Sequence, residues 1–126
     1  MAGLQLDGAG QAKMTTLDES MAIHQRIHTL VEQYALAIKS NQPASQFFTN
    51  LKRQMPVLAG KLKGQFGTVS DLVTATAMAM SRGASEQMRV RAMREGVAAI
   101  KVQLELAVAQ TVQRHKVKEE KQPTGE

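Results

Sequence analysis

Positively charged side chains are concentrated in the middle of this 126-residue chain. The chain has 16 Lys and Arg against 11 Asp and Glu, a net charge of +5. The segment from Lys39 to Arg94 has nine basic residues against two acidic ones, Asp71 and Glu86, so its net charge is +7. Lys and Arg attract polyanions, and Arg can donate two parallel hydrogen bonds to one phosphate. The segment therefore indicates a surface that binds nucleic acid or another acidic partner.

The residues that would form this surface lie outside the apolar stripes of the predicted helices. They are Lys52, Arg53, Lys61, Lys63, Arg82, Arg89, Arg91, Arg94 and Lys101. If the helices fold back antiparallel, Lys61 and Lys63 would lie near the arginines that begin the last helix. The aromatic residues fall on apolar stripes, so we expect contacts with DNA or RNA phosphates and little base readout. The alternative is a solvated charged surface that only keeps the protein soluble.

Two further patterns contain residues that can bind ligands. The stretch 60–68, GKLKGQFGT, precedes a helix N-terminus, where free amides and lysines could hold a phosphate. It lacks the Gly-Lys-Ser/Thr of a nucleotide-binding P-loop, so we favour an ordinary turn. His24, His28 and Glu32 follow at intervals of four, a spacing that could align metal ligands on a helix. We favour packed or surface histidines there.

The remaining composition argues against catalysis. We find no Ser-His-Asp arrangement and no paired carboxylates, and the absence of cysteine removes thiolate chemistry. The sequence therefore predicts a non-enzymatic protein with no cofactor and no metal site. There is no secretory signal and no run of 18 apolar residues, so we expect a cytoplasmic protein with no membrane partner.

Apolar periodicity predicts an all-α protein, a compact bundle of four to five helices with a long C-terminal helix. We expect the bundle in residues 15–116, between a flexible N-terminal lead at 1–14 and a flexible charged tail at 117–126. Thr16 and Glu19 have the spacing of a capping box, which predicts a first helix from about Leu17 to Ser40. Its apolar residues recur three and four apart at Ile23, Ile27, Leu30, Tyr34 and Ile38.

Two shorter helices are predicted next. The second begins near Pro43 or Ala44, and its stripe is Phe47, Phe48, Leu51, Met55, Leu58, Leu62 and Phe66. This stripe keeps its period through Pro56, so we expect a kink or brief break near Gln54–Met55. The third helix begins near Val69, is capped by Thr68 or Ser70, and ends at Gly83. Its inner face is Val69, Leu72, Val73, Thr76 and Met80.

The last helix is predicted from Glu86 to Lys116 with Ser85 as its cap. A heptad-like seam follows Val90, Met93, Val97, Ile100, Leu104, Ala107 and Thr111. This seam could pack within the bundle or pair with another copy or a partner helix. The methionines at helical spacing could be core filler, which we favour, or an adaptable docking groove. They are Met55, Met78, Met80, Met88 and Met93.

Small basic helical bundles recur as accessory subunits of nucleoprotein assemblies, for example the small subunits of CRISPR-type effectors. This is an analogy of fold and charge alone, because no motif in the chain supports it. The leading hypothesis is a protein that binds nucleic acid backbone non-specifically, alone or beside protein subunits of a larger assembly. The alternative is a protein–protein adaptor or chaperone that docks through a Met-rich surface or the seam of the last helix.

Overall fold

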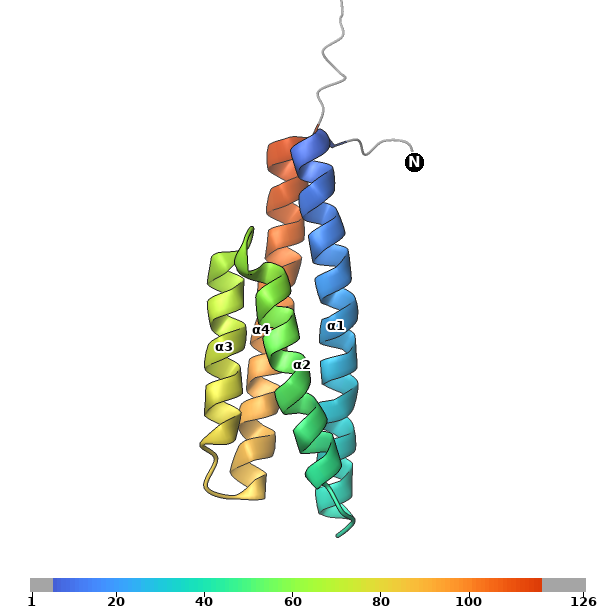
Figure 1. Ribbon diagram of the computed structural model, residues 1–126, viewed down its shortest axis with the longest axis vertical. Coiled ribbons are helices and arrows are strands. Elements are labelled where there is room, and N and C mark those ends of the chain that lie inside the picture. Colours follow the sequence, from blue (N-terminus) through green and yellow to red (C-terminus); the bar gives the residue numbers. More distant parts are fainter. Residues whose placement is uncertain (1–5, 117–126) are drawn as a thin grey trace, which may run out of the picture.

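Four helices connected by short turns make up the fold (Figure 1). The computed structural model describes residues 6–116. The helices are α1 (Gly8–Lys39), α2 (Ser45–Lys63), α3 (Gly67–Ser81) and α4 (Glu86–His115). Within residues 6–116 the only β feature is an isolated bridge between Leu6 and Lys116. The prediction of an all-α bundle with a long last helix is therefore confirmed.

Each helix packs against two others. Helix α1 contacts α2 and α4, and α3 contacts the same two helices, so α1–α3 and α2–α4 are the diagonal pairs. The α1–α2 and α3–α4 turns lie at one end of the bundle (Figure 1). Helices α1 and α4, with 32 and 30 residues, extend beyond α2 and α3 at the other end. None of these four helices is both long enough and apolar enough to cross a membrane.

Helix α1 begins earlier than its sequence indicates. The cap is Asp7, whose side chain accepts a 2.7 Å hydrogen bond from the Gly10 amide, so the predicted start near Leu17 is wrong. Residues 8–14, which we had assigned to a flexible lead, are the first turns of this helix. They pack on the end of α4, where Gly10 is buried and a Cβ would collide with His115. Residues 1–5 of the predicted lead and the predicted tail at 117–126 lie outside the described residues.

Helix α2 is continuous through Pro56. Of the predicted kink or brief break near Gln54–Met55, the break is therefore wrong, and the bundle has four helices. Pro56 lies on the exposed face, where its ring meets solvent and only one backbone hydrogen bond is lost. The opposite face stays intact and buries Leu51, Met55, Leu58 and Leu62.

Helix α3 begins at Gly67, two residues before the predicted start, and its cap residue Phe66 makes no side-chain capping bond. Thr68 and Ser70, the predicted caps, do not cap the helix. The Ser70 hydroxyl donates instead to the Ala59 carbonyl at 2.8 Å and so ties α3 to α2. At the other end, Gly83 is not in a left-handed conformation. Its missing side chain allows close approach of Arg89, whose Cα would lie 3.1 Å from an added Cβ.

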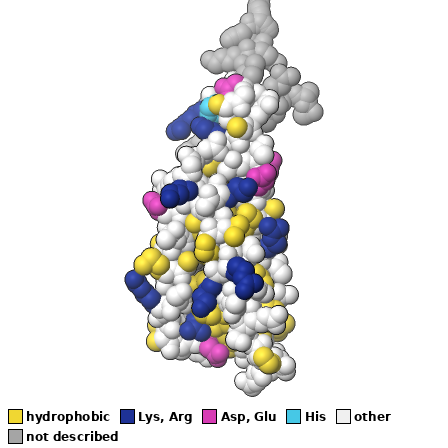
Figure 2. Space-filling view, in the orientation of Figure 1, with side chains coloured by type: hydrophobic (Ala, Val, Ile, Leu, Met, Phe, Trp, Pro, Cys, Tyr) yellow, Lys and Arg dark blue, Asp and Glu magenta, His cyan; other side chains and the backbone are white. Residues whose placement is uncertain are grey.

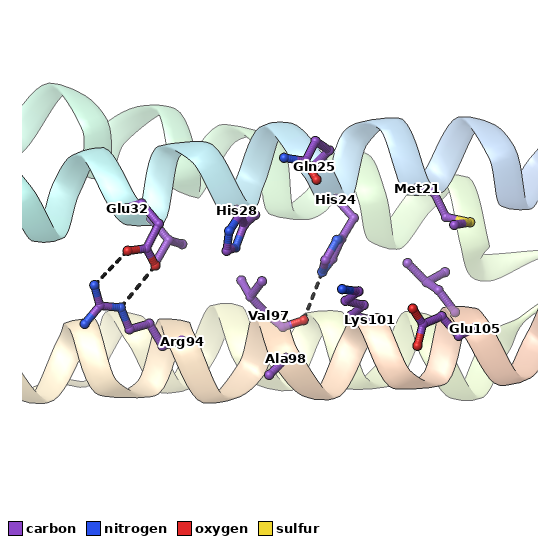
Figure 3. Close-up of a pocket in the computed structure, with 12 residues that line it drawn as sticks. Met21, His24, Gln25, His28, Glu32, Arg94, Val97, Ala98, Lys101 and Glu105 are labelled. Atoms are coloured by element: carbon purple, nitrogen blue, oxygen red, sulfur yellow. Dashed lines mark hydrogen bonds and ion pairs between the residues drawn. The ribbon is translucent and has the colours of Figure 1, made fainter.

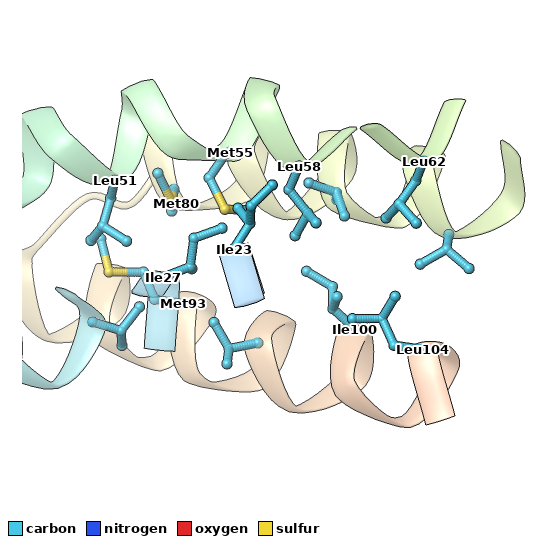
Figure 4. Packing of buried hydrophobic residues seen from close by; sticks show 14 of the residues in the cluster. Ile23, Ile27, Leu51, Met55, Leu58, Leu62, Met80, Met93, Ile100 and Leu104 are labelled. Atoms are coloured by element: carbon cyan, nitrogen blue, oxygen red, sulfur yellow. The ribbon is translucent and has the colours of Figure 1, made fainter. Parts of the chain in front are cut away.

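Helix α4 follows its prediction. Ser85 caps it by accepting a 3.1 Å hydrogen bond from the Met88 amide. The predicted seam faces the bundle interior, where Ile100 and Leu104 are 0% and 1% exposed. Side chains from all four helices meet them there, as Figure 4 shows for Ile23, Ile27, Leu51, Met55, Leu58, Leu62, Met80 and Met93. The seam is therefore used within the bundle.

Candidate nucleic-acid interface

The nine predicted binding residues lie on two opposite sides of the bundle. Four belong to α2 and four to α4, which form a diagonal pair, and Arg82 lies in the turn after α3. Lys61 of α2 contacts Glu19, whereas Arg94 of α4 contacts Glu32. These two partners are 13 residues apart on α1, which is about 20 Å along a helix. The juxtaposition of Lys61 and Lys63 with the α4 arginines is therefore not found.

Two arginines on the α4 side are paired with carboxylates. Arg94 donates to Glu32 through Nε at 3.1 Å and through its terminal nitrogen at 2.7 Å, a bidentate pair. The hydrogen bond from Arg94 lowers the pKa of Glu32, and that carboxylate raises the pKa of Arg94. Arg91 pairs with Glu95 one turn along the same helix at 3.3 Å. A phosphate on this side would have to compete with these acidic partners.

Arg89 differs from the other candidates because its charged head lies inside the loop end of the bundle. It donates to the Tyr34 hydroxyl at 3.1 Å and to the Met80 carbonyl at 3.3 Å. Its guanidinium carbon lies 4.5 Å from the centre of the Phe48 ring, a cation–π distance. Arg89 thus connects α4 to each of the other three helices, and its donors are used by the fold rather than offered to a ligand.

The groove between α1 and α4 is also occupied by internal contacts (Figure 3). His24 is buried and its Nε2–H donates to the Val97 carbonyl at 2.9 Å. Burial lowers the pKa of His24, so the ring is neutral. Among residues 6–116 there is no group of three or more His, Asp and Glu side chains that could hold a metal ion. His24 is therefore a packed histidine, as the sequence favoured.

Helix α2 presents three cations that form no ion pair within residues 6–116. Between Ser45 and Lys63 it has four basic residues and no acidic residue. Lys61 pairs with Glu19 at 2.8 Å, but Lys52, Arg53 and Lys63 are exposed and form no ion pair within residues 6–116. Figure 2, which views the bundle from this side, shows Lys and Arg side chains spread among hydrophobic ones with few acidic side chains nearby. Three of the four α2 cations are therefore free of ion pairs in the described part of the chain.

The three cations are spaced along the helix. Lys52 and Lys63 are 11 residues apart and share one flank of α2, so about 16 Å of helix separates them. Arg53 lies on the outermost face between α1 and α3. The Lys52 ammonium also lies 5.1 Å from the centre of the Phe48 ring, which holds it near the surface of the helix. The spacing suits an extended chain of phosphates better than a single anion.

Sequence reasoning missed one residue beside this surface, Arg26. It lies on α1 and lines a groove of about 480 Å³ between α1 and α2. Arg26 is outside the basic segment 39–94, so the charge count did not include it. The signal was its position seven residues after Glu19, which places both on one flank of α1. That flank is recognised as the α2 side only from the contact between Glu19 and Lys61.

The Gly-rich stretch 60–68 is divided between three features. Helix α2 continues through Gly60 to Lys63, a short turn follows, and α3 begins at Gly67. The Phe66 amide donates to the Leu62 carbonyl at 2.7 Å, which closes the turn. An ordinary turn between helices therefore accounts for this stretch.

Comparison of the chain with protein-family models, curated proteins and solved structures finds no match.

Proposed function

We propose that this protein is a non-enzymatic helical protein that binds the phosphate backbone of nucleic acid through α2, as an accessory subunit of a nucleoprotein assembly. One observation carries the proposal. Lys52, Arg53 and Lys63 are exposed along a helix that has no acidic residue, and none of them is paired within the described part of the chain. Each cation can neutralise a phosphate and release a counterion, which is the main source of sequence-tolerant affinity.

The same geometry limits specificity. Phe48, the aromatic residue nearest these cations, is half-buried between Tyr34 and Arg89 and offers no free face for base stacking. Three phosphate contacts without stacking correspond to weak binding, in the micromolar range or weaker at physiological salt. We therefore expect tight binding to need several copies or additional subunits.

Fluorescence anisotropy of a labelled oligonucleotide over a salt series tests the proposal. The variant Lys52→Gln/Arg53→Gln/Lys63→Gln removes three charges from α2. Its matched control, Arg91→Gln/Lys101→Gln/Arg114→Gln, removes three charges from exposed positions on α4. We expect the α2 variant to lose most of its affinity and to flatten the logarithmic salt slope by about 0.7–0.9 for each lost contact. The control should keep both.

Two results would contradict this assignment. Equal losses in the two variants would mean that total charge, and not the α2 surface, attracts the nucleic acid. No binding by the wild-type protein at low salt would remove nucleic acid as the ligand.

The alternative is a protein–protein adaptor, and one surface favours it. Leu36 is 64% exposed beside a groove of about 850 Å³ between the end of α1 and the start of α4, which Ile38 and Val90 also line. Of the docking sites considered from sequence, the α4 seam is buried, and Met55, Met80 and Met93 are core residues, whereas Met78 and Met88 are exposed. Apolar docking at Leu36 would persist at high salt, unlike phosphate binding. A Leu36→Ser variant that releases a captured partner at high salt would support the adaptor.

A further inference from the structure

The groove between α1 and α2 is lined almost entirely by neutral hydrogen-bonding side chains. Two of them, Asn50 and Gln54, are half-buried and form its floor together with Leu30. The rim consists of the exposed residues Gln25, Arg26, Thr29 and Gln33. Side-chain amides carry both donors and acceptors, so a groove of this type can match the polar edge of a nucleobase.

None of these polar side chains is used by the fold. Within residues 6–116, the side chains of Asn50, Gln54, Gln33 and Arg26 make no hydrogen bond or ion pair with the rest of the protein. The α1–α4 groove on the opposite flank of the same helix differs, because His24 bonds to the Val97 carbonyl and Glu32 bonds to Arg94. The groups between α1 and α2 are therefore available to a ligand.

The width of the α1–α2 pair excludes a double helix from this groove. Two packed helices, each about 10 Å across with axes 8–10 Å apart, form a ridge close to 20 Å wide. The major groove of B-DNA is about 12 Å wide and admits one helix, and the minor groove is about 6 Å wide. Side chains recessed between two helices therefore cannot reach base edges inside a duplex. Only unpaired bases, turned outward from their strand, can reach Asn50 and Gln54.

We propose that single-stranded nucleic acid is the ligand, with its backbone across the outer face of α2 at Arg53 and its bases in the α1–α2 groove. The amides of Asn50 and Gln54 hydrogen-bond to base edges, and the planar Arg26 guanidinium packs against a base, a contact common in single-strand recognition. This inference rests on the proposed function, because Arg53 on the outer face of α2 supplies the phosphate contact beside the groove, while Lys52 and Lys63 lie on the flank of α2 that faces α3.

Anisotropy with one labelled DNA sequence, as a single strand and as a duplex, tests the inference. The variant Asn50→Ala/Gln54→Ala removes the floor amides without changing charge, and Ala favours the helix. Its control, Gln103→Ala/Gln110→Ala, removes two amides from α4. We expect the wild-type protein to prefer the single strand by about tenfold, the scale of one good base contact. The floor variant should lose that preference with an unchanged salt slope, and the control should keep it.

The outcomes separate the two proposals. If the duplex binds as tightly as the single strand, or if the floor variant keeps the preference, the groove does not receive bases and the inference is overturned. If the Lys52→Gln/Arg53→Gln/Lys63→Gln variant nevertheless loses affinity, the proposal of phosphate binding by α2 still stands. If neither form of DNA binds at low salt, the proposed function fails as well. Circular dichroism of each variant confirms that its helices are formed.

Discussion

The two flanks of α1 use polar side chains in opposite ways. Toward α4, Glu32 and His24 bond to groups on the neighbouring helix and hold the two helices together. Toward α2, Glu19 pairs with Lys61, but Gln33 and Arg26 face amides on the neighbouring helix without bonding to them. The α2 flank thus keeps unused hydrogen-bonding groups beside its one ion pair. A groove whose polar groups are unused is a better candidate for ligand binding than one in which Glu32 and His24 are already bonded.

The basic residues also differ in whether they have partners, but not helix by helix. Lys61 of α2 is paired with Glu19, and Lys101 of α4 is exposed and forms no ion pair within residues 6–116. Arg89 donates hydrogen bonds to the Tyr34 hydroxyl and the Met80 carbonyl at the loop end of the bundle, and Arg94 donates hydrogen bonds to Glu32. Arg53 and Lys63 on α2 have no such partner within the described residues. Net charge in the sequence counts all of these residues equally, whereas only those without a partner can bind a phosphate without first breaking an internal contact.

The largest effect is expected from the buried seam of α4. Ile100→Ala and Leu104→Ala should each lower the free energy of unfolding by about 2–5 kcal/mol, because each leaves a cavity in the core. Val102→Ala on the same helix is the control, since Val102 is 52% exposed and should change stability by less than about 0.5 kcal/mol. Urea denaturation measures all three. Equal, small effects would mean that the seam is not interior, and sedimentation would then show whether it holds copies together.

The next largest effect is expected from an arginine that is bonded inside the bundle, compared with an exposed one. Arg89→Gln should destabilise the protein by about 1–3 kcal/mol, because the Tyr34 hydroxyl and the Met80 carbonyl lose a charged donor. Arg53→Gln should leave stability within about 0.5 kcal/mol of the wild type, because Arg53 is exposed. Thermal melts of both variants provide the comparison. If the two melts coincide with that of the wild type, Arg89 is not a structural residue and returns to the candidate binding surface.

Sequence patterns predicted α4 best, and the reason is local. The Ser85 cap and the recurring apolar residues up to Thr111 agree with each other, so both the start of the helix and its buried face follow from neighbouring residues. The start of α1 could not be predicted in this way. Gly8 and Gly10 disfavour a helix on their own, but Gly10 allows His115 to pack closely against the first turns. Only the folded chain brings these residues together.

Part of the candidate site could also be predicted, because it depends on residues that are neighbours in the sequence. The absence of acidic residues between Ser45 and Lys63 is visible in the sequence, and the cations of α2 follow from it. The engagement of Arg89 was not predictable, because its partner Tyr34 is 55 residues away. The α1–α2 groove was missed because Asn50 and Gln54 carry no charge or motif. Their relation to Arg26 arises only when the two helices pack.

A smaller, pH-dependent effect is expected from His24. Burial lowers the pKa of His24 below its ordinary value of 6.5, so the folded protein binds fewer protons there than the unfolded chain. The contribution of the neutral ring is fully present above pH 6.5 and is lost as the pH falls from 6.5 toward the lowered pKa. Unfolding free energies of the wild type and a His24→Gln variant, measured across this window, should converge as the pH falls.

Gln25→Ala is the control for this measurement, because Gln25 is a neutral, exposed residue of α1. Its unfolding free energy should follow the wild-type pH dependence. Glu32 acts in a separate window. Its pKa is lowered by Arg94, so its contribution is lost only as the pH falls through that lowered pKa, below the usual value of 4.5. A His24→Gln variant with the same pH dependence as the wild type between pH 6.5 and 4.5 would contradict a neutral, buried ring.

The central claim is that the α2 side, and not the α4 side, binds nucleic acid. The most direct measurement is a titration of the isotopically labelled protein with a single-stranded oligonucleotide at low salt, followed by amide chemical shifts. The account predicts that the largest shifts fall on α2 around Arg53 and on the facing flank of α1 around Arg26, while amides around Arg91 and Lys101 stay in place. Shifts centred on α4, or no shifts at all, would contradict it.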